Sequence, residues 1–134
     1  ARLLERDLEI ETLNARMSEG LYRTSKERKE DPTLEFLYRS AGPVWYRGMV
    51  CADEKYDPLT PEQTGALLRR YDADRLLVGH TIFPDISTFH DGRVIAVNVQ
   101  NDLNRRKNRG RAVLIEGSRI SVVGNRGVKR VLEE

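Results

Sequence analysis

The chain has 134 residues, which is long enough for one domain with a single hydrophobic core and too short for two comfortable ones. Its 23 lysines and arginines nearly balance its 21 aspartates and glutamates, so a net charge of +2 gives no reason to expect nucleic acid or a membrane as a partner. The single cysteine, Cys51, excludes an internal disulfide and a zinc site built from thiolates of this chain. No apolar run approaches the roughly 20 residues of a membrane span.

Residues 1–40 are dense in charge and rich in helix formers, which indicates a helical cover over the rest of the chain. Apolar residues at helical spacing predict a helix over about residues 10–20. Residues 23–30 are either a second short helix or an exposed connection. Asp31 before a proline is typical of an N-cap, and it predicts a short helix over residues 33–38.

An aromatic run with one arginine follows the break in helical pattern at residues 40–43. One interpretation is a core-packing pair, Trp45 and Tyr46, with Arg47 reaching out to solvent. The other is that the aromatic neighbours hold Arg47 rigid, so that its planar fork can bind a carboxylate or a phosphate. Both interpretations stay open on the residues alone.

A predicted helix and strand lead to one of the two histidines of the chain. The Thr-Pro-Glu-Gln pattern at residues 60–63 is that of a capping box with proline in the first turn, and it predicts a helix that ends near residues 71–74. Residues 76–78 predict a buried strand, which is followed directly by Gly-His-Thr at residues 79–81. His80 offers a nitrogen for a metal or a proton, and a structural, hydrogen-bonded histidine is the alternative.

Two β-hairpins are expected in the last third of the chain. The first pairs residues 86–89 with residues 94–99 through an Asp-Gly turn. The second pairs residues 112–115 with residues 119–123. Residues 128–132 add an edge strand or a tail.

The stretch between the hairpins, residues 101–111, carries five positive charges against one negative charge. Such a stretch can attract phosphate-bearing ligands. It contains no aromatic residue to stack on bases, so we expect a mobile, solvated loop rather than nucleic-acid recognition.

These patterns predict an α/β or α+β chain that forms a single domain or fragment over residues 1–134. Within it, residues 1–40 form the helical cover and residues 41–134 form a mixed sheet portion with the two hairpins at its C-terminal end.

Two motifs carry a resemblance to a known family. One is the strand-end motif at residues 76–81 with residues 91–97 after it, and the other is Gly-Pro-Val-Trp-Tyr-Arg-Gly at residues 42–48. Together they resemble the calcineurin-like metallophosphoesterases, above all bacterial members related to the serine/threonine protein phosphatases. The resemblance implies a β-sandwich flanked by helices, with His80 as a metal ligand and Arg47 in contact with phosphate. It also implies two divalent metal ions, such as manganese, iron or zinc, and a phosphorylated substrate.

The family's N-terminal motifs do not occur in this chain: Asp-x-His, Gly-Asp-x-x-Asp-Arg, Gly-Asn-His followed by an acid, and His-Gly-Gly. The resemblance therefore implies the C-terminal portion of a metal-dependent phosphatase that hydrolyses phosphomonoesters, with the N-terminal half of the same protein as its partner. Because a two-metal centre needs several converging ligands, we expect this chain alone to bind no metal and to be inactive.

The alternative function is a non-catalytic folding or oligomerisation module. Half of a sandwich exposes strand edges, which favour pairing with a second copy as a homodimer. The sequence leaves the compartment open between cytoplasm and periplasm.

Overall fold

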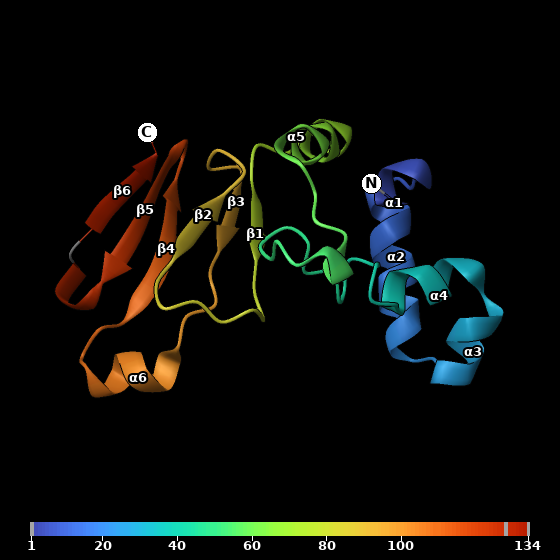
Figure 1. The fold of residues 1–134 in the computed structure, drawn as a ribbon, viewed down its shortest axis with the longest axis horizontal. Helices are drawn as coiled ribbons and strands as arrows, with labels where there is room; N and C mark the ends of the chain where they lie inside the picture. Colours follow the sequence, from blue (N-terminus) through green and yellow to red (C-terminus); the bar gives the residue numbers. More distant parts are fainter. Residues whose placement is uncertain (1, 128, 134) are drawn as a thin grey trace. The chain divides into compact units, whose positions relative to one another are not determined.

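A computed structural model describes residues 2–127 and 129–133, and it divides into two compact units, Ala1–Asp74 and Arg75–Glu134. We describe each unit by itself. The first unit is built from helices, and the second contains both β-sheets (Figure 1). No helix in the described part of the chain has both the length and the apolar character needed to cross a membrane.

Several helices of the first unit begin where the sequence places capping residues. In chain order they are α1 (Arg2–Glu5), α2 (Ile10–Leu21), α3 (Ser25–Glu30), α4 (Pro32–Tyr38), the 3-10 helix η1 (Glu54–Tyr56) and α5 (Pro61–Arg70). The Asp31 carboxylate accepts from the N–H groups at the start of α4, and Thr60 forms a capping box with Gln63 at the start of α5. The predicted helix starts are therefore confirmed, and α3 decides the open choice at residues 23–30 in favour of a helix.

The core of the first unit lies between α2 and α4. Leu13 of α2 packs with the buried Phe36 and Leu37 of α4. Gly20 allows the two helices to approach, because the ring of Tyr38 occupies the space that a Cβ at residue 20 would need. The Tyr38 hydroxyl donates to the Met17 carbonyl oxygen, so the same ring also links the helices by a hydrogen bond.

The first sheet of the second unit has the strand order β1-β3-β2. Its strands are β1 (Leu76–Val78), β2 (Ser87–Phe89) and β3 (Val94–Ala96). The predicted hairpin is confirmed by the antiparallel pairing of β2 with β3, although both strands are shorter than expected. The central strand β3 is buried throughout, whereas Leu77 in the parallel neighbour β1 is 44% exposed, so the prediction of a fully buried strand there was wrong.

The second sheet has the order β4-β5-β6, with β4 (Arg111–Glu116), β5 (Arg119–Gly124) and β6 (Lys129–Glu133). The second predicted hairpin is confirmed by the β4–β5 register, and the last segment is an edge strand rather than a tail, apart from residue 128, which lies outside the described residues. The two sheets share one core, in which Ile95 of β3 packs in the same cluster as Ile120 and Val122 of β5. This arrangement confirms a mixed α+β class.

The stretch at residues 101–111 differs from the expected loop. It contains the helix α6 (Asn101–Arg106), and β4 begins at Arg111. Asn104 of α6 is buried, and its Oδ1 accepts hydrogen bonds from Nε and from a terminal nitrogen of Arg109, at 3.1 and 3.0 Å. A buried polar side chain, Asn104, therefore holds this helix in place. A row of apolar residues, which would have been visible in the sequence, does not do so.

Candidate functional site

His80 lies where the chain leaves β1. The Val78 carbonyl oxygen still accepts from Val97 N–H at 2.9 Å, and the Thr81 N–H then donates to the Gly79 carbonyl oxygen at 2.8 Å, which closes a tight turn. His80 is at the centre of this turn with a φ of 67°, in the left-handed region that few residues other than glycine adopt. Its side chain is exposed at the end of the strand.

The far end of the same loop is fixed by Asp85. Its Oδ1 accepts from Arg111 Nε at 2.8 Å and from the Ile86 N–H at 2.8 Å, and its carbonyl oxygen accepts from the Ser87 hydroxyl at 2.9 Å. Burial alone would raise the pKa of Asp85, but the hydrogen bonds from Arg111 and from the Ile86 N–H outweigh it and hold the pKa below its usual range. The loop that carries His80 therefore ends on an ionised, anchored carboxylate.

The Arg47 segment, residues 42–48, is a series of turns rather than a strand. The Tyr46 N–H donates to the Gly42 carbonyl oxygen at 2.9 Å, and the Tyr46 hydroxyl donates to the Asp57 carbonyl oxygen. Gly48 accepts from the Leu59 N–H at 3.1 Å, and the Tyr46 side chain covers the space beside it. These contacts bind the Arg47 segment to the chain around η1.

The Arg47 side chain itself is half-buried. Its guanidinium carbon lies 5.9 Å from the centre of the Tyr56 ring, and the ammonium group of Lys55 lies 4.9 Å from the same ring. Trp45 is 53% exposed, so it is not part of a core-packing pair. The aromatic ring beside the Arg47 guanidinium is that of Tyr56 and not that of Trp45, and the contact of Arg47 with a phosphate stays a prediction.

Arg47 belongs to the first unit and His80 to the second. Within the described residues, no three histidine, cysteine, aspartate or glutamate side chains gather as metal ligands. A bound divalent ion needs at least three such donors or their equivalents, and His80 supplies one. The described residues therefore do not fit the two-metal centre that the family resemblance implied.

Sequence reasoning missed the residues that support both candidates. Asp85 and Arg111 are 26 positions apart, and no local pattern indicates that they pair. Lys55 and Tyr56 lie in a 3-10 helix of three residues, which is too short to leave a periodic signal in the sequence. Asp53 in front of that helix, whose carboxylate accepts from the Lys55 N–H at 3.1 Å, was the one capping signal available.

Comparison with known proteins gives a fold but no family. No protein-family model matches the chain, and no curated protein matches it. Solved structures of a cold-active protein tyrosine phosphatase do match. One, determined at 1.1 Å, has a TM-score of 0.80 and 23% sequence identity, and another, from a psychrophilic Shewanella species, has a TM-score of 0.79 and the same identity.

The match covers 99% of this chain and 37% of the first of those structures, and 98% and 38% for the second. The chain therefore spans less than two fifths of the length of the proteins whose fold it shares. The sequence-based recognition is corrected by this finding, because the matching structures are described as protein tyrosine phosphatases and not as calcineurin-like metallophosphoesterases. The family-specific form of the predicted sandwich is not supported either.

Proposed function

We propose that this chain takes part in the hydrolysis of a phosphoester on a phosphorylated protein, and that Arg47 and His80 are its site residues. The observation that carries the proposal is the fold likeness over nearly the whole chain, at a TM-score of 0.80, to a protein described as a tyrosine phosphatase. Phosphotyrosine thus replaces the phosphoserine or phosphothreonine expected from the sequence.

The two side chains suit different parts of that reaction. The Arg47 guanidinium can donate a pair of parallel hydrogen bonds to phosphoryl oxygens, and its support on the Tyr56 ring reduces the entropy lost on binding. His80 can carry a proton to or from the reacting group, because an imidazole has a nitrogen that can accept or donate one and the side chain is exposed. Its role as a ligand of a divalent ion stays a prediction, since the remaining ligands would have to come from outside the described residues.

The test of His80 uses the polypeptide that the complete gene encodes and a phosphotyrosine peptide as substrate. His80→Asn removes the imidazole and keeps a residue that tolerates a positive φ. We expect kcat to fall by about 100-fold or more, the range for loss of a group that transfers a proton. His90→Asn is the matched control, because His90 also has a positive φ, of 53°, and lies in the β2–β3 turn. Full activity in His80→Asn would overturn its assignment.

The test of Arg47 is the substitution Arg47→Gln, with Arg69→Gln on the exposed side of α5 as its control. Loss of a charge-assisted hydrogen bond to phosphate is worth about 1.5–3 kcal/mol, so kcat/KM should fall by about 10- to 150-fold in Arg47→Gln only. A phosphothreonine peptide of the same sequence tests whether the specificity is for phosphotyrosine. Assays with manganese and with a chelator test whether His80 is a metal ligand. Equal rates in Arg47→Gln and Arg69→Gln would contradict the phosphate contact.

A second function, self-association without catalysis, is favoured by one observation. In the β4-β5-β6 sheet both outer strands expose an apolar side chain, Ile115 of β4 and Val131 of β6. The same strands carry charged residues, including Lys129 paired with Glu116 at 2.8 Å, and charges on edge strands disfavour pairing between copies. Light scattering of the chain should give a dimer if this function holds and a monomer if it does not.

A further inference from the structure

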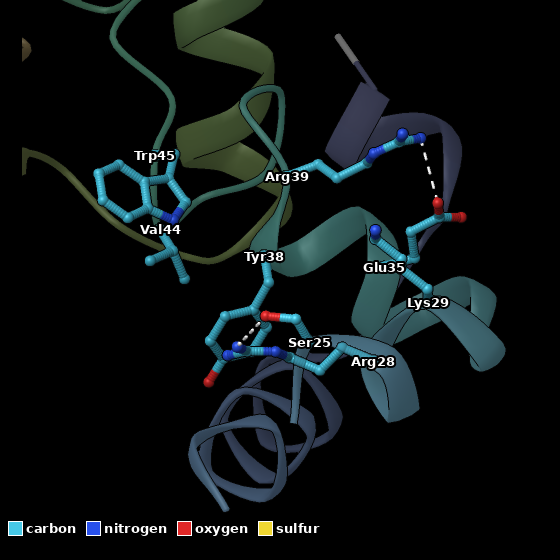
Figure 2. A pocket seen from close by; sticks show the side chains of 8 residues that line it. All are labelled: Ser25, Arg28, Lys29, Glu35, Tyr38, Arg39, Val44 and Trp45. Carbon is cyan, nitrogen blue, oxygen red and sulfur yellow. Dashed lines mark hydrogen bonds and ion pairs between the residues drawn. The ribbon is translucent and has the colours of Figure 1, made fainter. Parts of the chain in front are cut away.

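The first unit has a surface pocket beside the Arg47 segment. It has a volume of about 420 Å³ and is lined by α3, by the end of α4 and by Val44 and Trp45 (Figure 2). Apart from Trp45, none of its lining residues was assigned a binding role by the sequence or by the comparisons.

The charges around the pocket are mainly positive. Three cationic side chains line the pocket, those of Arg28, Lys29 and Arg39, together with one carboxylate, that of Glu35. Glu35 already forms an ion pair with Arg39, at an N–O distance of 3.1 Å, so the pocket offers a surplus of cationic groups to a ligand. This charge distribution favours an anionic ligand and disfavours a cationic one.

Aromatic side chains, Tyr38 and Trp45, form part of the pocket lining, and Arg28 is held against the first of them. The Arg28 guanidinium lies 4.5 Å from the centre of the Tyr38 ring and donates to Ser25 Oγ at 3.4 Å and to the Gly20 carbonyl oxygen at 3.3 Å, so its position is set by three groups. Trp45, 53% exposed, completes the wall. Tryptophan and arginine side chains that are held in place and accessible are the usual anchors of protein–protein recognition.

Trp45 also links the pocket to Arg47. The two residues are two positions apart in the Arg47 segment, and two residues of chain span at most about 7 Å. A peptide that contacts Trp45 therefore passes within a few residues of a phosphate bound by Arg47.

We infer that this pocket binds an acidic peptide segment, one that lies next to the phosphorylated residue of the substrate. Its carboxylates pair with Lys29, Arg28 and Arg39, and its apolar side chains lie on Trp45. The assignment of this peptide to the substrate rests on the proposed function, whereas the preference for an acidic peptide rests on the pocket alone.

Trp45 provides a direct readout, because it is the only tryptophan in the chain. The chain is titrated with a short peptide of alternating glutamate and leucine and with its glutamine counterpart, both free of aromatic residues, while tryptophan fluorescence is recorded. We expect a saturable change with the acidic peptide, weaker at high salt, and little change with the glutamine peptide. An equal response to both peptides would overturn the inference.

Charge reversal identifies the residues. Lys29→Glu should raise the Kd for the acidic peptide about tenfold, which corresponds to about 1.4 kcal/mol. Lys26→Glu is the matched control, since Lys26 is exposed on the same helix and does not line the pocket, and it should leave the Kd unchanged. If both variants bind the acidic peptide equally weakly, the effect is one of net charge, and the peptide does not bind in this pocket.

The substrate assignment is tested separately, by kinetics on phosphotyrosine peptides with glutamate or glutamine next to the phosphorylated residue. Lys29→Glu should lower the preference for the acidic peptide, measured as a ratio of kcat/KM values, about tenfold. If neither peptide is hydrolysed, the proposed function fails while the fluorescence result stands by itself. If both are hydrolysed with no preference, the function holds and the assignment of the pocket to the substrate fails.

Discussion

Arg111 Nε lies 2.8 Å from Asp85 Oδ1, and this ion pair joins the start of β4 to the end of the loop that carries His80. Both side chains are partly buried. The pair therefore connects the second sheet to the turn that follows β1, and it limits how far that loop can move from the sheet.

Removing the charge of Asp85 should weaken this connection in a pH-dependent way. Because its pKa in the folded protein is lowered, ionised Asp85 stabilises the fold above the pKa of about 3.9 that an aspartate has in an unfolded chain. That contribution is lost as the pH falls through the lower pKa of the folded state. Asp85→Asn should therefore be less stable than the unmodified chain at pH 7, and by a smaller margin at pH 3, in urea unfolding monitored by circular dichroism. An equal difference at both pH values would contradict the ion pair as its cause.

The capping box at α5 makes a second prediction. Thr60 Oγ accepts from the Gln63 N–H at 3.2 Å, and Gln63 Oε1 accepts from the Thr60 N–H at 2.9 Å. Thr60→Ala leaves one backbone donor without its partner, and we expect a loss of about 1 kcal/mol in the free energy of unfolding. Thr12→Ala, on the exposed face of α2, is the control and should be neutral or slightly stabilising, because alanine is the better helix former. An equal loss of unfolding free energy at both positions would show that the capping box does not stabilise the fold.

Much of the local structure could be predicted because its causes are local. Asp31 and Thr60 mark helix starts by hydrogen bonds that span two or three residues, and the turn after Phe89 contains the glycine that a hairpin requires. The parallel pairing of β1 with β3 could not be predicted, since it depends on contacts between residues such as Leu77 and Ile95, far apart in the sequence. Helix α6 was missed because the buried Asn104 is held by Arg109 rather than by an apolar stripe.

The candidate site shows the same division. A glycine followed by histidine after a strand was enough to place His80 at a strand end. Its left-handed φ and its link through the loop to Asp85 depend on the folded chain and leave no pattern in the sequence. Arg47 was identified with two interpretations, and the ring of Tyr56, nine residues later, supports one of them.

The contact between α2 and α4 gives a third prediction. A Cβ at residue 20 would lie 2.2 Å from Tyr38 Cε2, so Gly20→Ala must push apart the Tyr38 ring and the helix below it. Overpacking of this kind costs about 1–3 kcal/mol, and we expect a loss of that size in urea unfolding. Gly79→Ala is the control for stability, because no atom lies within 4 Å of a Cβ there. Gly20→Ala as stable as the unmodified chain would mean that α2 and α4 pack differently.

Tyr46 gives a prediction at alkaline pH. Burial, and then the nearby Asp57 carboxylate, raise its pKa to about 12. In an unfolded chain a tyrosine has a pKa of about 10, so the stabilising effect of protonated Tyr46 is complete below pH 10 and is lost as the pH rises towards 12. Titration of the phenolate absorbance should therefore show one of the five tyrosines ionising near pH 12, and Tyr46→Phe should remove that step.

The control for this titration is Tyr22→Phe, because Tyr22 is 90% exposed, so the step near pH 12 should persist in that variant. Tyr46→Phe should also lose stability less steeply than the unmodified chain between pH 10 and 12, since phenylalanine has no proton to release. Disappearance of the step in Tyr22→Phe, or its persistence in Tyr46→Phe, would show that the Tyr46 hydroxyl is not buried against the Asp57 backbone. The Arg47 segment would then lack its side-chain contact with the backbone at Asp57.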